Sequence, residues 1–314
     1  MKVVFMGTPD FSVGTLKALV EAGHEVAAVV TQPDKPKGRG HSVQFTPVKE
    51  EALGHGLTVY QPKRVRDPEF IKTLEEIAPD VIVVVAFGQI IPKEILNLAP
   101  YGCINVHASL LPKYRGAAPI QWAVIDGEKE SGVTIMRMDE GLDTGDMMAK
   151  AVVSLDVWET SGSLFDKLSR VGADLLIQTL EDLQEGKVSY EKQPEESPTP
   201  YAQMIQKQMG KIDWNNSAEK IERLIRGLDP WPSAYTYLNK KTLKIWKAHL
   251  TEEVAKAEPG TVVRIDKKGI YVACSDCVLC LDEVQLEGKK RMACADFLRG
   301  YKVEESTRLT MNKE

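Results

Sequence analysis

Val81-Ile-Val-Val-Val-Ala-Phe87 is the stretch of sequence that decides the fold. Its five consecutive β-branched residues are typical of a strand that is buried on both faces, as at the centre of a parallel sheet. A second strand is expected at Gly102–Val106. Because helices must cover both faces of such a sheet, the run predicts an α/β domain.

Strand and helix patterns alternate on the N-terminal side of this run. Short strands are expected at Lys2–Met6, Glu25–Val30 and Leu57–Tyr60, with helix-period stretches between them. A helix is also expected from Pro68, and a long one reaches Gly186. The alternation predicts a Rossmann-like parallel sheet.

The composition changes at residues 190–206, where Pro194 to Pro200 contains three prolines. We interpret residues 190–206 as an extended linker. Beyond it, several short strand patterns with close turns predict a small OB-like β-barrel. The predicted domains are therefore a Rossmann-like domain of residues 1–189 and a C-terminal domain of residues 207–314.

Bulk composition restricts the class of protein. The chain has 314 residues, of which 43% are hydrophobic and 27% charged, as is usual for a soluble globular protein. No apolar run approaches the roughly 20 residues that span a bilayer, and residues 1–6 are too short for a secretion signal. We therefore expect a cytoplasmic protein that does not contact a membrane. Five cysteines are an odd number, which disfavours a disulfide framework.

Charge is distributed unevenly along the chain. Residues 201–314 hold 20 basic and 16 acidic side chains, whereas residues 1–200 hold 20 basic and 29 acidic ones. A basic C-terminal part favours a nucleic-acid partner. The polar stretch Thr31–Phe45 carries Lys35, Lys37 and Arg39 among glycines. It is either a solvated loop or an arm that contacts a phosphate backbone.

Two patterns in the C-terminal part have a functional and a plain structural interpretation. Tyr235, Tyr237 and Trp246 alternate with lysines, so they could stack on single-stranded nucleic acid or pack within a hairpin. The motif Cys274-x-x-Cys277-x-x-Cys280 could belong to a metal or iron–sulfur site. No histidine lies near it in the sequence and the segment is strand-like, which favours a buried strand.

Asn105 and His107 lie two residues apart at the end of the strand that follows the central run. Residues i and i+2 of a strand share a face, so the amide and the imidazole would project side by side. The carboxyl edge of an open α/β sheet is where ligands bind. A fixed N–H donor beside a titratable base suits acyl transfer, although an Asn–His hydrogen bond that ends the strand would give the same spacing.

The loop Met138–Asp146 contains four acidic residues and two glycines. One of its carboxylates could reach His107 and orient the imidazole. The loop lacks the terminal Glu of a calcium-binding loop, and a solvated loop is the other interpretation. The turn Gly7-Thr-Pro-Asp-Phe11 lacks G-x-G-x-x-G, so it does not favour a nicotinamide cofactor.

Taken together, these motifs resemble the folate-dependent formyltransferase family. The core of the resemblance is Asn105-x-His107, Ser109-Leu-Leu-Pro112 and Asp143-x-Gly145-Asp146. Further matching segments are Phe5–Phe11, Gln32–Gly40, Gly116–Trp122 and Asp229–Pro232. The resemblance covers essentially the whole chain, and the basic loop and the C-terminal domain point to the branch of the family that uses tRNA.

The resemblance implies a reaction and three catalytic residues. A formyl group would pass from 10-formyltetrahydrofolate to the α-amine of methionyl initiator tRNA by direct attack, for initiation of translation and without a metal. Asn105 would donate a hydrogen bond to the oxyanion, His107 would stabilise it and move a proton, and Asp143 would set the protonation of the imidazole. The enzyme would act as a monomer, with residues 1–189 as its catalytic domain.

The resemblance also implies binding residues. Folate would lie beside two segments, which comprise Ser109, Leu110, Leu111, Pro112, Ala86, Phe87, Gly88 and Gln89. Transfer RNA would contact Lys35, Lys37 and Arg39 of the basic loop, and residues 207–314 would form a tRNA-binding domain.

Two alternatives remain at this point. An enzyme of the same family could formylate a nucleotide-sugar amine or glycinamide ribonucleotide, although a glycinamide enzyme would have no need of residues 207–314. The chain could instead be a non-catalytic module that binds tRNA or folate, which the intact Asn105, His107 and Asp143 disfavour.

Overall fold

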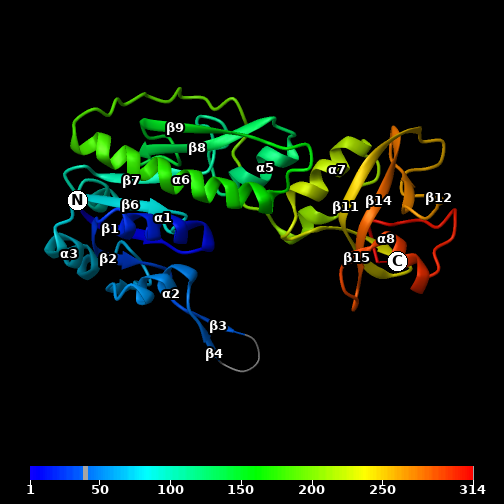
Figure 1. The fold of residues 1–314 in the computed structure, drawn as a ribbon, viewed down its shortest axis with the longest axis horizontal. Helices are drawn as coiled ribbons and strands as arrows, with labels where there is room; N and C mark the ends of the chain where they lie inside the picture. The colour runs from blue at the N-terminus through cyan, green and yellow to red at the C-terminus, as the bar shows by residue number, and fades with distance from the viewer. Residues whose placement is uncertain (38–41, 314) are drawn as a thin grey trace. The chain divides into compact units, whose positions relative to one another are not determined.

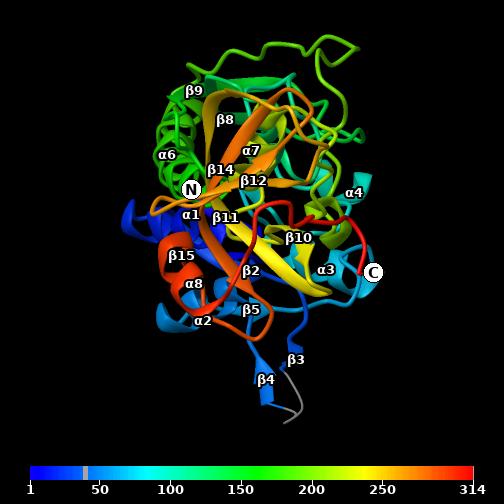
Figure 2. The ribbon, with the colours of Figure 1, turned by 90° about the vertical axis from the view of Figure 1, so that its right-hand side faces the viewer.

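A computed structural model of the protein describes residues 1–37 and 42–313 and divides into two compact units (Figures 1 and 2). The first unit comprises Met1–Pro119, Glu130–Ser154 and Phe165–Ala202. The second comprises Ile120–Lys129, Leu155–Leu164 and Gln203–Glu314. Among the described residues, no helix combines the length and the apolar character that a membrane span requires.

The first unit is built on a seven-stranded sheet with the order β5-β2-β1-β6-β7-β8-β9. Its strands are β1 (Lys2–Gly7), β2 (Glu25–Val30), β5 (Val59–Tyr60), β6 (Val81–Val85), β7 (Cys103–His107), β8 (Glu130–Arg137) and β9 (Met147–Ser154). All five residues of β6 are buried, as its β-branched sequence predicts. A separate two-stranded sheet pairs β3 (Lys35–Lys37) with β4 (Ser42–Gln44).

Helices cover both faces of the large sheet. The helices of this unit include α1 (Asp10–Glu21), α2 (Pro47–Gly54), α3 (Pro68–Ile77), α4 (Lys93–Leu96) and most of α6 (Ser161–Gln184). Apolar side chains of α3 and α4 pack on β1, β2 and β6 in one core cluster. On the other face, Ser169 of α6 donates a hydrogen bond to the carbonyl of Phe11 in α1. A Cβ on Gly172 would lie 2.9 Å from Val106, so a residue without a side chain lets α6 approach β7 closely.

The large sheet is not fully parallel, which corrects the sequence prediction. Strands β5, β2, β1, β6 and β7 are parallel, whereas β8 runs antiparallel to β7 and β9 antiparallel to β8. Only residues 138–146 connect β8 to β9. A parallel crossover needs a dozen or more residues, so this short connection forces a hairpin. The α/β class and the Rossmann-like parallel half are confirmed.

The segment that was predicted as a linker packs against the first unit through residue 202. Met147 and Glu191 exchange two main-chain hydrogen bonds, and the Ala202 N–H donates to the carbonyl of Arg115. Residues 120–129 and 155–164 cluster with the C-terminal residues instead. The proposed boundaries at residues 189 and 207 therefore remain a prediction about the domains.

The second unit contains a small antiparallel barrel. Its strands follow the order β10-β11-β14-β13-β12, with β15 beside β14. Its elements are α5 (Pro119–Ile125, whose Pro119 belongs to the first unit), η2 (Lys207–Gly210), α7 (Ala218–Gly227), β10 (Ala234–Leu238), β11 (Lys241–Val254), β12 (Val262–Ile265), β13 (Ile270–Ala273), β14 (Cys277–Leu286), β15 (Met292–Ala293) and α8 (Cys294–Gly300).

The C-terminal segment links the two edges of that sheet. Residues 306–309 form main-chain hydrogen bonds with Gly260, just before β12, and with Val262, its first residue, and Thr310 exchanges two with Tyr237 of β10. Both edge strands are therefore paired, and the predicted small barrel is confirmed.

Candidate active site

The predicted Asn–His pair lies at the edge of the sheet where three parallel strands end. Gly7 at the end of β1 is level with Val85 of β6, and Val84 is level with Asn105 of β7. Asn105 and His107 alternate with Val106 along β7, so they share one face of the strand. This is the edge at which open α/β sheets bind ligands.

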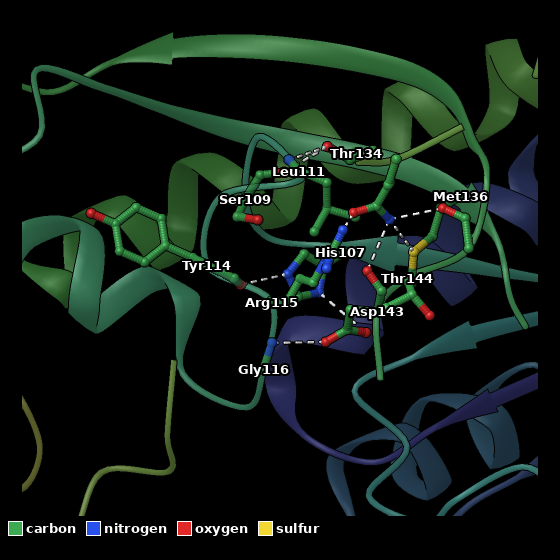
Figure 3. Close-up of polar contacts among 12 residues, drawn as sticks. His107, Ser109, Leu111, Tyr114, Arg115, Gly116, Thr134, Met136, Asp143 and Thr144 are labelled. Carbon is green, nitrogen blue, oxygen red and sulfur yellow. Dashed lines mark hydrogen bonds and ion pairs between the residues drawn. The ribbon is translucent and has the colours of Figure 1, made fainter. Parts of the chain in front are cut away.

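The imidazole of His107 is buried, and a main-chain carbonyl sets the tautomer of its neutral form. Its Nε2 atom lies 3.0 Å from the carbonyl oxygen of Tyr114 (Figure 3). A carbonyl oxygen only accepts, so Nε2 carries the hydrogen and the neutral ring keeps its lone pair on Nδ1. Nδ1 lies 3.8 Å from Oδ1 of Asp143, which is within ion-pair range but beyond a direct hydrogen bond. An imidazolium formed by protonation of Nδ1 would therefore face a carboxylate.

Asp143 is the acidic residue of the β8–β9 loop that reaches this histidine. Its second carboxylate oxygen, Oδ2, accepts a hydrogen bond of 2.9 Å from the N–H of Gly116. Two other carboxylates of the loop are used elsewhere: Asp139 accepts from Thr144, and Glu140 pairs with Lys93. The fold thus brings Asp143, rather than these two neighbours, to His107.

The side-chain amide of Asn105 is available to a ligand. Asn105 is partly exposed, and within residues 1–37 and 42–313 no hydrogen bond engages its side chain. No buried side-chain nitrogen or oxygen of the described residues lacks a partner, so the amide of Asn105 must reach the surface. A rigid strand therefore presents a free N–H donor next to the imidazole, as an oxyanion site requires.

The segment predicted to bind folate at residues 109–112 is shaped by buried hydrogen bonds. Ser109 is fully buried, and its hydroxyl donates to the carbonyl of Lys113. Thr134 of β8 donates to the Ser109 carbonyl at 2.7 Å and accepts from the N–H of Leu111 at 3.0 Å. Leu111 is buried, whereas Leu110 and Pro112 are partly exposed. Contact with folate stays a prediction, and the buried side chains of Ser109 and Leu111 hold the loop's shape.

Thr134→Val tests this buried support. Valine has nearly the shape of threonine but leaves one buried carbonyl and one buried N–H without their partner. Because each unsatisfied group costs about 1–3 kcal/mol, we expect the free energy of unfolding to fall by roughly 2–4 kcal/mol in urea titrations. Thr179→Val is the matched control, because the hydroxyl of Thr179 only supplements a helix carbonyl. Equal losses in the two variants would contradict this account.

The loop after β6, also predicted to bind folate, has two inward and two outward residues. Phe87 is buried, and its carbonyl accepts hydrogen bonds from Thr8 and Gln32. The side-chain oxygen of Gln89 accepts a hydrogen bond from the main-chain N–H of Val65. Ala86 and Gly88 are exposed and both have positive φ, at 46° and 86°. Phe87 and Gln89 therefore anchor a sharp turn, and folate contact by any of the four stays a prediction.

Two of the three basic residues predicted to contact tRNA, Lys35 and Lys37, belong to β3 of the ribbon that β3 forms with β4 (Figure 2). Lys35 is exposed at the start of β3, and Lys37 ends the strand. Arg39 lies outside the described residues. Asp34, just before this ribbon, is held by Lys49 and Gln61. Contact of these basic residues with tRNA stays a prediction.

Three aromatic residues of the second unit, Tyr235, Tyr237 and Trp246, lie on the outside of its barrel. Burial alternates along β10, so Tyr235 and Tyr237 point away from the core, with ring centroids 5.9 Å apart. Trp246 on β11 is also partly exposed, and cations of Lys244 and Arg291 lie 5.4 Å and 4.6 Å from the centre of its ring. Aromatic faces beside cations form a suitable surface for nucleic acid.

The three cysteines of the Cys-x-x-Cys-x-x-Cys motif do not converge. Cys274 and Cys277 pack on the barrel core, whereas Cys280 belongs to a different cluster with Tyr271. The fold does bring His249 opposite Cys280, a proximity that sequence spacing could not show. Burial raises the pKa of the Cys280 thiol to about 11, so the thiol is protonated near neutral pH.

The sequence analysis missed the residues that hold the loop of Tyr114 and Arg115 next to His107. Arg115 is buried and donates to Gln193 and to the carbonyls of Pro194 and Glu195. The N–H of Tyr114 donates to the hydroxyl of Thr199 at 2.7 Å. These contacts join positions about 80 residues apart, and the proline-rich composition that we interpreted as a linker gives no sign of them.

Comparison with known proteins matches both halves of the chain. Residues 1–180 match the family model described as "Formyl transferase", and residues 204–302 match "Formyl transferase, C-terminal domain". A protein of Lachnospira eligens named methionyl-tRNA formyltransferase is 59% identical over 97% of this chain and 98% of its own length. A protein of Agathobacter rectalis with the same name is 58% identical over 99% and 100%.

Solved structures share the fold at low sequence identity. A sugar 3N-formyl transferase, WlaRD, described with dTDP and 5-N-formyl-THF, is 20% identical and has a TM-score of 0.68. The alignment covers 92% of this chain and 99% of that one. HypX from Aquifex aeolicus, described in complex with tetrahydrofolic acid, is 18% identical with a TM-score of 0.62, over 98% of this chain and 50% of HypX.

Proposed function

The chain belongs to the formyltransferase family, and we infer that it transfers a formyl group from 10-formyltetrahydrofolate to the α-amine of methionine on initiator tRNA, for initiation of translation. The observation that carries this function is the near full-length identity of 58–59% to proteins named methionyl-tRNA formyltransferase, over both units of the chain. We also propose that the enzyme acts in the cytoplasm, where its tRNA substrate is used, and as a monomer. One chain supplies all three catalytic residues that we propose.

The reaction exchanges one carbon–nitrogen bond for another. The neutral amine of the aminoacyl group attacks the formyl carbon, and the carbonyl oxygen becomes an oxyanion in a tetrahedral intermediate. The bond from the formyl carbon to N10 of the folate then breaks. One proton leaves the amine and one reaches N10, so there is no net uptake of protons. The exchange is direct and requires no formyl-enzyme intermediate.

We assign the stabilisation of the oxyanion to Asn105. Its amide is a hydrogen-bond donor on a buried sheet, available at the edge where ligands bind. Because the strand already holds the donor in place, little reorganisation is needed when charge develops on the formyl oxygen. The adjacent imidazole of His107 can add to this stabilisation when it is protonated.

We assign the movement of the proton to His107, assisted by Asp143. The lone pair on Nδ1 can take a proton, since the other ring nitrogen is committed to the carbonyl of Tyr114. The carboxylate of Asp143, 3.8 Å from Nδ1, stabilises the imidazolium that results. We propose that a water that hydrogen-bonds to both groups relays protons between them.

We propose that the folate co-substrate binds beside the loop after β6 and the 109–112 segment. The exposed turn at Ala86 and Gly88 lies beside the end of β7, because Val84 is level with Asn105 in the sheet. Ile90, just beyond it, is 82% exposed, and this apolar surface suits an aromatic ring system. We propose that main-chain groups of these two segments hold the folate next to Asn105.

We propose that the tRNA contacts the basic ribbon and the aromatic outer face of the barrel. If Lys35, Lys37 and Arg39 each contact one phosphate, raising the salt concentration from about 50 to 200 mM would lower the affinity for tRNA roughly 20- to 40-fold. We therefore expect KM for methionyl-tRNA to rise steeply over this range in steady-state assays, while KM for the folate changes little.

Matched lysine variants sharpen the salt test. Lys35→Gln should reduce the slope of log KM against log salt by about one. Lys17→Gln, on the exposed surface of α1, should leave the slope unchanged. A response to salt that is flat in the parent enzyme would favour a small amine acceptor.

A formylation assay separates the proposed function from its rivals. Charged initiator tRNA and a nucleotide-sugar amine are offered as acceptors, each with 10-formyltetrahydrofolate. Formylation of the tRNA alone supports the proposal, whereas formylation of the sugar amine alone would overturn it. Binding of both substrates without any product would identify a non-catalytic module.

A further inference from the structure

We propose that Gln193 is a positioning residue that fixes the approach of Asp143 to His107. The inference rests on the proposed function, because it assumes that these two residues take part in formyl transfer. Gln193 does not contact the reacting atoms of Asp143 or His107. It binds main-chain carbonyls of the loop that carries Asp143 and the side chain of Arg115 in the loop that contacts both residues.

The first loop held by Gln193 is the one that bears Asp143. Asp143 has a positive φ of 56°, a left-handed backbone conformation that is unfavourable for a residue with a side chain and persists where the surroundings hold it. The Nε2 atom of Gln193 donates to the carbonyl oxygens of Asp143 and Gly145, both at 2.8 Å. One side-chain amide therefore uses both of its hydrogens to hold the strained turn.

The second loop held by Gln193 contacts both catalytic side chains. The carbonyl oxygen of Gln193, Oε1, accepts a hydrogen bond of 3.0 Å from Nε of Arg115. The carbonyl of Tyr114, just before Arg115, accepts a hydrogen bond from the imidazole of His107. The N–H of Gly116, just after it, donates to the carboxylate of Asp143. Arg115 is thus the middle of a three-residue segment that sets the position of both catalytic groups (Figure 3).

The Gln193 amide joins these two loops as a single rigid bridge. Its nitrogen donates to two carbonyls of one loop and its oxygen accepts from the other loop, and the same nitrogen lies 3.9 Å from the sulfur of Met136. The buried guanidinium of Arg115 is fastened further to the carbonyls of Pro194 and Glu195. Loss of the bridge would let the loop of Asp143 relax away from His107, and an error of 1 Å in a catalytic geometry can cost about 100-fold in rate.

Gln193→Met tests the bridge, because methionine keeps the length of the side chain and loses its hydrogen bonds. We expect kcat to fall by about 10- to 100-fold, while KM for methionyl-tRNA stays within about threefold, since the proposed tRNA contacts lie elsewhere. Gln178→Met on the exposed face of α6 is the matched control and should retain full activity.

Gln193→Glu separates the two halves of the bridge and serves as the test if the methionine variant fails to fold. Glutamate can still accept from Arg115, but it has no hydrogens for the carbonyls of Asp143 and Gly145. We expect it to be as impaired as the methionine variant. Full activity of Gln193→Glu would overturn the proposal.

A double-mutant cycle with Asp143→Asn separates positioning from a general structural role. If Gln193 acts by placing Asp143, adding Gln193→Met to an enzyme that already carries Asp143→Asn should lower kcat by less than about threefold. An equal fold-loss in both backgrounds would overturn the positioning role and leave the proposed function intact. Full activity of Asp143→Asn by itself would instead remove Asp143 from the proposed mechanism, and the inference would fail with it.

Discussion

His107→Gln is expected to lower kcat/KM for formyl transfer by about 10²–10⁴-fold, the usual contribution of a general acid–base residue. The amide nitrogen of glutamine can donate to the carbonyl of Tyr114, as Nε2 of the imidazole does at 3.0 Å. Glutamine has no lone pair that takes a proton near neutral pH. The variant therefore keeps the structural hydrogen bond and removes only the base. Steady-state formylation with both substrates measures the loss.

The control for this variant is the same substitution at an exposed histidine of the first unit. His55 directly follows the last residue of α2 and pairs with Glu51 on the surface. His55→Gln should retain the activity of the parent enzyme. Activity of His107→Gln within about threefold of the parent, with an unchanged unfolding temperature, would exclude His107 from proton transfer.

Asn105→Ala is expected to lower kcat by about 10²–10³-fold, which corresponds to the roughly 2.7–4 kcal/mol that one oxyanion donor contributes. The side chain makes no hydrogen bond to the described residues, so its removal should hardly change the unfolding temperature. KM for the folate should change less than kcat, because the bond strengthens as the oxyanion forms. Single-turnover formylation measures the chemical step directly.

Asn105→Asp sharpens this test, because it keeps the size of the side chain and places a negative charge where the oxyanion develops. Its loss should be at least as great as that of the alanine variant. Asn97→Ala, at the exposed end of α4, is the control and should be fully active. An active Asn105→Asp would show that no oxyanion forms next to this side chain.

The architecture of the first unit was largely predictable from local patterns. The run Val81–Phe87 predicted the central strand, and the helix and strand periods around it predicted the α/β class. The direction of β8 and β9 was not predicted, because strand direction depends on the length of connections and not on the pattern within a strand. The connection of residues 138–146 contains this information, but it was interpreted as a loop between apolar runs.

Part of the site was also predictable. The spacing of Asn105 and His107 placed two polar side chains on one face of a strand end, since the period of a strand is two. Among four acidic residues in the β8–β9 loop, only the family resemblance singled out Asp143. The structure adds the physical reason, which is the N–H of Gly116 on one carboxylate oxygen and His107 near the other.

The sequence by itself determined the α/β class, the small C-terminal barrel and the Asn105–His107 pair, because these follow from periodicity and spacing within short segments. Only the tertiary structure decided how the pair is held. Gln193 lies 50 residues beyond Asp143 and 78 beyond Arg115, yet its amide contacts both loops. A hydrogen bond between distant segments leaves no periodic trace in the chain, so the proline-rich composition from which we predicted a linker gave no sign of these contacts.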